Sequence, residues 1–307
     1  MNVVSKLLRH ELISGSFYIF LGSMFANFLA FLLNLFLARN LTYADYAIFA
    51  SLVSVITLAS IPAGSINAVI VKFAANYFAK QELDKGAVFY RKTFKYILYI
   101  CIVSIVGFFI LSTPIKNFLR LDNIFYVVLA GLIVASFYLA MLNNAFLQSL
   151  LKFKFLSLMS IVAGAVKLIA GVILVFMGYK ALGALWAIFF MTLASFLVGF
   201  IPLKSLFKKY NKNIVITARK EILSYAVPVS ITVLSLTAFT SMDVILVKHF
   251  FNPQEAGFYA GLSLIGKVIF YFTGPIPMVM FPLLVKRHAT GVNFNNLFSL
   301  QNLSFNI

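Results

Sequence analysis

The sequence predicts an all-α protein that crosses a membrane several times, and three observations support this prediction. Of the 307 residues, 62% are hydrophobic and only 11% are charged, and the mean hydropathy is +1.00. A soluble domain of this length keeps much of its surface in water and does not bury so many apolar side chains. The chain also holds eight apolar stretches of about 20 to 28 residues, long enough for an α-helix to cross a bilayer. These stretches lack the alternating pattern of membrane barrel strands.

The eight predicted spans divide into two groups. Six lie within residues 1–210, which we predict to form one helical lobe, and two lie within residues 211–307, which we predict to begin a second lobe. In chain order, the predicted spans are Ser14–Ala38, Tyr46–Ile70, Thr93–Ser112, Ile124–Asn143, Leu156–Met177, Ala181–Leu203, Ile222–Val247 and Ala256–Leu284.

Positive charge predicts how these spans are oriented. If the amino terminus is cytoplasmic, the inner segments hold 18 of the 25 Lys and Arg residues, the outer segments hold five, and two lie within spans. Cytoplasmic loops carry such an excess of Lys and Arg, so we expect a multi-pass protein of the cytoplasmic membrane with its N-terminus inside. The same rule explains the net charge of +17. We therefore expect membrane lipids, and no nucleic acid, as partners of the basic segments.

An internal repeat links the start of the chain to its later part. In both Asn34–Leu52 and Asp243–Leu262, a polar residue precedes a cation by five positions, and a turn, an acid and a new span follow. The copies are six spans apart and thus share one orientation, which predicts a parallel repeat like those of transporters with two similar halves. The second copy holds two of the expected six spans, so we expect the sequence to be truncated or incomplete.

Two lysines inside predicted spans are the leading candidates for a functional site. A cation at the centre of a bilayer costs roughly 2.5–3.5 kcal/mol, so it usually lines a water-filled cavity or has a partner. Lys167 has small residues on both sides at helical spacing, which leave room for a long side chain, and Lys267 shares a helix face with Ser263 and Tyr271. We predict that Lys167, Lys267 and Tyr271 line a cavity and contact an anionic substrate. The alternative is a structural lysine that pairs locally or extends along a seam between helices.

Five further residues belong to the predicted site. Asp243 lies inside a predicted span, where it either couples transport to an ion or forms a structural ion pair with Lys248 near the outer surface. Asn34 and Asn27 either add polar groups to the cavity or hydrogen-bond neighbouring helices. Arg39 and Lys248 flank the predicted outer mouth, where they either steer an anion inward or anchor the protein at the interface.

Three amide side chains form a further polar cluster in the sequence. Asn143, Asn144 and Gln148 gather at the inner end of the fourth predicted span, where they either bind lipid headgroups or cap the helix.

Enzyme chemistry has little support, because the three histidines are far apart and no HExxH, no Walker glycine loop and no pair of acids for a metal occurs. We expect no catalytic residue, no metal site and no cofactor.

Several segments resemble the polysaccharide flippases (Wzx-type) of the MATE-like superfamily. Arg39–Phe49 resembles the first outer turn of that family, with Ala47 where glycine is usual. Ala145–Phe155 resembles the inner connection after the fourth span, with Ser149 where glycine is common, and Asp243–Ala260 is similar to the turn between spans seven and eight. The resemblance covers essentially the whole chain and implies one six-helix MATE-like lobe followed by the first two helices of a second.

The resemblance also implies a function. The family moves a polyprenyl-pyrophosphate-linked oligosaccharide, such as an O-antigen unit, to the outer leaflet by alternating access between two lobes. It implies a lipid-linked oligosaccharide as substrate and a polysaccharide polymerase and glycosyltransferases as partners. Lys167 and Lys267, one from each lobe, would neutralise the pyrophosphate. The alternatives are a drug or organic-cation antiporter of the same superfamily, a membrane-embedded glycan-transfer enzyme, and a non-transporting scaffold or truncated relic.

Overall fold

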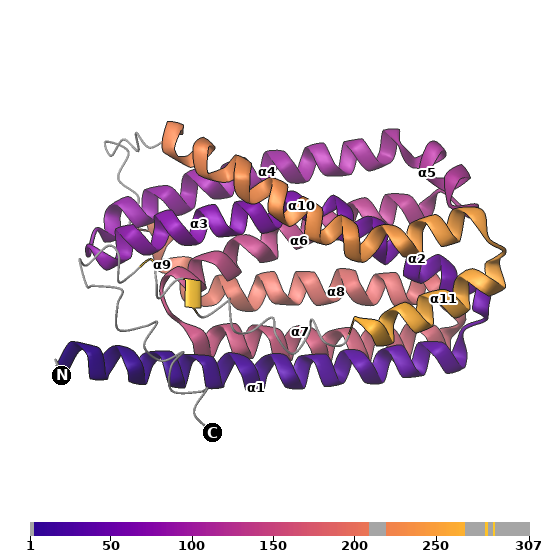
Figure 1. The fold of residues 1–307 in the computed structure, drawn as a ribbon, viewed down its shortest axis with the longest axis horizontal. Helices are drawn as coiled ribbons and strands as arrows, with labels where there is room; N and C mark the ends of the chain where they lie inside the picture. Colours follow the sequence, from indigo (N-terminus) through magenta and orange to yellow (C-terminus); the bar gives the residue numbers. More distant parts are fainter. Residues whose placement is uncertain (1–2, 209–218, 268–279, 282–284, 286–307) are drawn as a thin grey trace, which may run out of the picture.

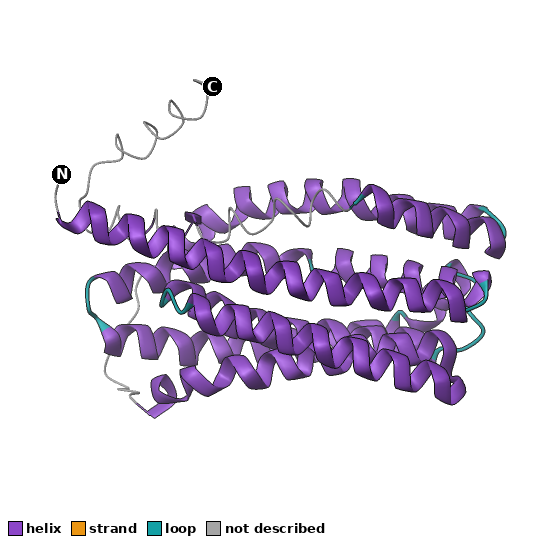
Figure 2. Ribbon diagram, turned by 90° about the horizontal axis from the view of Figure 1, so that it is seen from below, coloured by secondary structure: helices purple, strands orange, loops and turns teal. Residues whose placement is uncertain are grey.

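The structure is a computed structural model that describes residues 3–208, 219–267, 280–281 and 285. Within these residues every regular element is a helix, and the long helices lie side by side along the longest axis of the molecule (Figures 1 and 2). The all-α fold is therefore confirmed. The α-helices are α1 (Val3–Asn40), α2 (Tyr43–Ala59), α3 (Ile61–Ala79), α4 (Leu83–Ile110), α5 (Ser112–Phe118), α6 (Phe125–Ser149), α7 (Phe153–Leu174), α8 (Lys180–Phe200), α9 (Lys204–Lys208), α10 (Arg219–Phe250) and α11 (Pro253–Gly266). A π-helical turn, η1 (Val175–Tyr179), precedes α8, and a 3-10 turn, η2 (Ile201–Leu203), follows it.

The described helices include four stretches that are long and apolar enough to cross a membrane, and α2 with α3 forms a fifth candidate. The four are Phe17–Asn40, Leu83–Ile110, Phe125–Ser149 and Phe153–Leu206. The last of them contains both α7 and α8, which turn back on each other at η1 and pack together (Figure 1). These helices confirm a polytopic membrane protein.

The second predicted span is not one straight helix. It consists of α2 and α3, which are bent by 41° at Ser60. Pro62 follows in the first turn of α3, where it has no N–H to continue the hydrogen-bond ladder of α2. At the end of α2 the Ile56 carbonyl accepts two hydrogen bonds from Ser60, one from its hydroxyl over 2.7 Å and one from its backbone N–H over 2.9 Å. This break was not predicted from the sequence, although Pro62 marks it.

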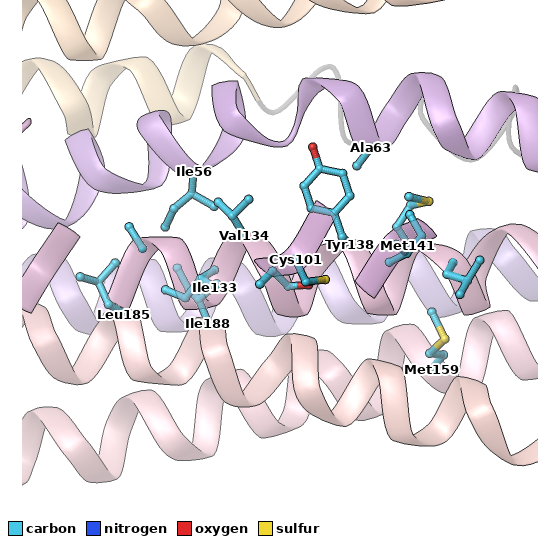
Figure 3. Packing of buried hydrophobic residues seen from close by; sticks show 14 of the residues in the cluster. Ile56, Ala63, Cys101, Ile133, Val134, Tyr138, Met141, Met159, Leu185 and Ile188 are labelled. Carbon is cyan, nitrogen blue, oxygen red and sulfur yellow. The ribbon is translucent and has the colours of Figure 1, made fainter. Parts of the chain in front are cut away.

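Helix α6 is the centre of the bundle. In its apolar window 67% of the residues are buried, against 11% in α4, so α6 is largely enclosed by other helices while most of α4 is exposed at the surface of the bundle. Figure 3 shows this packing: Val134 lies beside Ile56 of α2, while Ile133 lies beside Ile188 of α8. The bundle is therefore organised around a helix that also carries two of the polar residues of the cavity described below, Asn144 and Gln148.

The repeat identified in the sequence has a shared local structure. Thr42 caps α2 by accepting a hydrogen bond from the Asp45 backbone N–H over 3.2 Å, and Asn252 caps α11 by accepting one from the Glu255 N–H over 2.8 Å. Each acid lies three residues after its cap, where a negative charge stabilises the helix N-terminus. The two copies also contact each other, because Gly257 of α11 packs against the Tyr43 backbone. We call this end of the bundle the predicted outer end.

Candidate functional site

A cavity of about 500 Å³ lies between α3, α6, α7 and α8, with Phe281 also on its border. Its described polar lining is uncharged and comes from three helices. It consists of Asn67 on α3, Asn144 and Gln148 on α6, and Thr192 and Ser195 on α8. Apolar side chains, among them Phe137, Met141 and Met159, form the rest of the wall. Such a mixture of an apolar wall and a few polar groups is typical of small-molecule sites.

The polar groups of this cavity differ in how well they are paired. Gln148 donates from its amide nitrogen to the Asn144 side-chain oxygen. The Thr192 hydroxyl lies 2.6 Å from the Ser136 hydroxyl and also contacts carbonyls of its own helix, so its hydrogen is already engaged by the protein. Within the described part of the chain, the Asn67 amide and the Ser195 hydroxyl form no hydrogen bond with the protein. These two groups are thus available to a ligand or to water.

Lys167 lies beside this cavity. Ala163 lines the cavity and Lys167 follows four residues later, so both lie on one face of α7, about 6 Å apart along the helix. The neighbouring face of α7 packs on α1, where a Cβ atom added to Gly164 would lie 3.2 Å from the Ala26 Cα. None of the described residues forms an ion pair or a hydrogen bond with the Lys167 ammonium group. It is an uncompensated cation inside an apolar helix.

Asn27 and Asn34 lie on the same side of the α1–α7 pair as Lys167. The two helices run in the same direction, since Ala26 faces Gly164 and the next contact along both chains joins Leu33 to Gly171. When two parallel helices touch, the residue that follows the contact on one helix and the residue that precedes the contact on the other point to the same side of the helix pair. Asn27 and Asn34 directly follow the contact residues of α1, and Ala163 directly precedes Gly164. The two asparagines therefore extend the polar surface around Lys167.

Asp243 is the centre of a second polar group, which joins α10 to α11. Its Oδ1 lies 3.6 Å from the Lys267 Nζ, and its Oδ2 accepts hydrogen bonds from Ser263 over 2.9 Å and Tyr259 over 3.2 Å. The three partners are four residues apart and so form one stripe of α11. Side chains of a helix lean toward its N-terminus, which lets Lys267, at the C-cap of α11, reach back to Asp243.

The ion pair expected at Asp243 is present, but the predicted partner was wrong. Lys248 follows Asp243 by five residues, which places it about 140° away around α10. It is only 4% exposed, and its charged neighbours are Arg120 and Asp122. The adjacent His249 stacks on Phe118 at 4.0 Å. Lys248 therefore lies in the contact between α10 and the segment after α5.

Arg39, in contrast, is exposed in the last turn of α1. Lys167 and Lys267 each belong to a different polar group, and the structure does not pair them. Tyr271, the remaining residue of the predicted site, lies outside the described residues.

The three amides near the end of α6 neither cap that helix nor face headgroups as a group. Helix α6 continues to Ser149, so all three lie within its last turns. Asn143 is fully buried and binds Tyr90 and the Phe196 carbonyl, while Asn144 and Gln148 line the cavity. The capping prediction was wrong because the helix ends nearly two turns after the predicted span, at Ser149 rather than at Asn143.

Three residues of the cavity, Asn67, Thr192 and Ser195, were not predicted from the sequence. Each is a polar residue in an otherwise apolar segment, and the spacing of three between Thr192 and Ser195 places both on one helix face, so this signal was available. Among the residues that the structure places, no three His, Cys, Asp or Glu side chains form a group able to hold a metal ion.

Comparisons with known proteins identify a family and a relative of this chain. The sequence model of a family described as "Polysaccharide biosynthesis protein" matches residues 12–288. The uncharacterized membrane protein MJ1375 of Methanocaldococcus jannaschii is 30% identical, over 94% of this chain and 72% of the relative.

Two solved MATE transporters have a similar fold. The multidrug transporter DinF-BH has a TM-score of 0.66 at 14% identity, over 94% of this chain and 66% of that one. ClbM, in complex with Rb⁺, has a TM-score of 0.65 at 16% identity, over 92% of this chain and 63% of that one. The chain thus spans slightly less than two thirds of these transporters, and at such identities the likeness shows the fold alone.

Proposed function

Because the chain belongs to the family of polysaccharide biosynthesis proteins, we propose that it is a flippase for a polyprenyl-pyrophosphate-linked oligosaccharide. The family and the MATE-like fold support the coarser function of a membrane transporter. The observation that carries the finer proposal is Lys167, a cation without a partner among the described residues, beside a cavity inside the bundle.

An anionic headgroup compensates Lys167 in a way that the described protein groups do not. A lysine at bilayer depth costs several kcal/mol unless an anion or water meets it, and a pyrophosphate brings at least two negative charges. The side-chain amides of Asn27 and Asn34 have N–H groups to donate to phosphate oxygens. The substrate headgroup therefore binds between α1 and α7, next to the cavity.

The group around Asp243 supplies a gate. In the described conformation Asp243 neutralises Lys267, so this lysine is not free to bind substrate. A phosphate that approaches Lys267 competes with Asp243 for the ammonium group. When the phosphate replaces Asp243 as the partner of Lys267, the contact between α10 and α11 becomes weaker. Binding of substrate is thereby coupled to a rearrangement of α10 against α11 within the second predicted lobe.

The antiporter alternative has less support from the side chains. Of the two similar MATE structures, DinF-BH is described as a multidrug transporter, and ClbM is in complex with Rb⁺. An unpaired acid would favour a bound cation, but none of the described residues that line the cavity is an acid, and Asp243 outside it is already engaged by Lys267, Tyr259 and Ser263. Translocation breaks no covalent bond, so the proposal needs no catalytic residue and no cofactor.

The proposal includes a location and partners. The chain works in the cytoplasmic membrane with its N-terminus inside. There it receives its substrate from glycosyltransferases and passes it to a polysaccharide polymerase.

The test measures delivery of a lipid-linked oligosaccharide to the outer leaflet in cells that lack their own flippase. We expect the parent and Lys167→Arg to restore delivery, because both keep a cation, and Lys167→Ala to abolish it. Lys204→Ala, which removes an exposed lysine from α9, is the matched control and should deliver normally. Full delivery by Lys167→Ala would refute the headgroup contact. No delivery by a correctly inserted parent would contradict the flippase and leave the scaffold alternative.

A further inference from the structure

We infer that the cavity between α3, α6, α7 and α8 is a sugar subsite that binds the first, uncharged sugar of the substrate, the one bonded directly to its phosphate. This inference rests on the proposed function and deepens it, because it assigns a second part of the substrate to a second set of residues.

The chemistry of the lining matches a sugar. Amides and hydroxyls both donate and accept hydrogen bonds, as sugar hydroxyls do. Asn67 and Ser195 have no protein partner within the described residues, and the Gln148–Asn144 bond leaves the Gln148 carbonyl oxygen and the Asn144 amide nitrogen to a ligand. A polar group in an apolar wall is best satisfied by a polar occupant, and this cavity collects four such groups without a described protein partner.

The shape and wall of the cavity also match. Its volume of about 500 Å³ lies within the range of roughly 300–1,000 Å³ that is usual for small-molecule sites. Phe137, Met141 and Met159 offer apolar surface to the C–H faces of a sugar ring. The cavity therefore takes a small part of the glycan rather than its full length.

The position of the cavity selects which sugar enters. Lys167 lies one helical turn, about 6 Å, from Ala163 in the cavity wall. In a polyprenyl-pyrophosphate-linked glycan the first sugar is bonded to the phosphate itself. A phosphate held at Lys167 thus brings this sugar, and not a distant one, to Asn67 and Ser195.

The absence of charge selects the kind of sugar. None of the described side chains that line the cavity is charged. A sugar carboxylate would lose its hydration there without gaining a cation in the lining, which is far more costly than transferring a hydroxyl. The subsite accordingly favours a neutral hexose over a hexuronic acid.

The test is direct binding to the purified full chain in detergent with three probes. They are farnesyl pyrophosphate, the same molecule carrying glucose on its terminal phosphate, and the glucuronic acid analogue. We expect the parent to bind the glucose probe about tenfold more tightly than the bare probe, and the glucuronic acid probe no better than the bare one. Asn67→Ala and Ser195→Ala should each weaken binding of the glucose probe about 3- to 10-fold, as expected for one lost hydrogen bond, and leave the bare probe unaffected. Thr57→Ala, which alters an exposed hydroxyl on α2, is the control for both probes.

Each other outcome identifies what has failed, provided that thermal unfolding shows every variant to be folded. If the parent binds the bare and glucose probes equally, or if both cavity variants keep the preference, the sugar subsite is wrong while the headgroup site stands. A preference for glucuronic acid overturns the selection for neutral sugars. If neither probe binds to the parent, the proposed function fails, and the subsite fails with it.

Discussion

Tyr90 on α4 donates a 2.8 Å hydrogen bond to the Oδ1 of Asn143 on α6, and both residues are completely buried. Asn143 in turn donates from its Nδ2 to the Phe196 carbonyl of α8 over 2.9 Å. One amide thus links the largely exposed helix α4 to the two helices that supply most of the polar cavity wall. Because Asn144 is the next residue, this link also fixes how the cavity amides are presented.

Removing the Tyr90 hydroxyl should destabilise the fold. Tyr90→Phe leaves the Asn143 oxygen without this donor in a buried environment, which costs about 1–3 kcal/mol. Tyr99→Phe is a matched control, because Tyr99 lies on the same helix and is 55% exposed. Thermal unfolding in detergent should show a clear decrease of Tm for Tyr90→Phe only. Equal Tm values for both variants would mean that the hydrogen bond contributes nothing to stability.

The sequence predicted the helical fold well because apolar length is a direct consequence of bilayer thickness. The sequence predicted less about where helices bend and about which side chains pair with each other. The break at Ser60 depends on Pro62, and the short helix α5 is too short to give an apolar stretch of its own. Helix boundaries were misplaced at the end of α6, where Asn143 and Gln148 interrupt the apolar pattern but continue the helix.

Pairing within the candidate site needed tertiary information. Asp243 and Lys267 are far apart in sequence, and only the tight turn between α10 and α11 brings them to the same level. The stripe of Tyr259, Ser263 and Lys267 was readable from its spacing of four, but its partner was not. Lys167, by contrast, stood out because a lysine in an apolar run is costly wherever its side chain points.

Replacing Lys167 by a neutral residue should stabilise the protein. Lys167→Met keeps the length of the side chain and removes a charge that has no described partner, so unfolding should become more difficult by about 1–3 kcal/mol. Functional sites often carry such a cost, and their removal then raises Tm while it lowers activity. The check is the Tm of Lys167→Met alongside that of Lys204→Met. A decrease of Tm for Lys167→Met would show instead that this lysine has a structural role.

The Asp243–Lys267 pair should behave as one unit in a double-mutant cycle. Asp243→Asn and Lys267→Gln each leave one charge uncompensated, whereas the double variant leaves none. We expect a coupling free energy of about 1–2 kcal/mol from Tm and unfolding enthalpy, modest because both side chains remain partly accessible. Tyr259 and Ser263 still have an oxygen to donate to in Asp243→Asn, so the cycle isolates the charge. Purely additive single effects would show that the pair does not hold α10 to α11.

Two glycines of α11 should respond in opposite ways to the same substitution. A Cβ on Gly257 would lie 2.5 Å from the Tyr43 carbonyl oxygen, whereas a Cβ on Gly261 would have no atom of the described structure within 4 Å. Gly257→Ala therefore forces α11 away from α2, at a cost of about 1–3 kcal/mol. Gly261→Ala gains helix propensity of up to about 1 kcal/mol without a clash. Thermal unfolding should give a lower Tm for the first variant and a higher one for the second. If both variants gained stability, α11 would not depend on its close contact with α2, and the gate proposed at Asp243 would lose its mechanical link to the first predicted lobe.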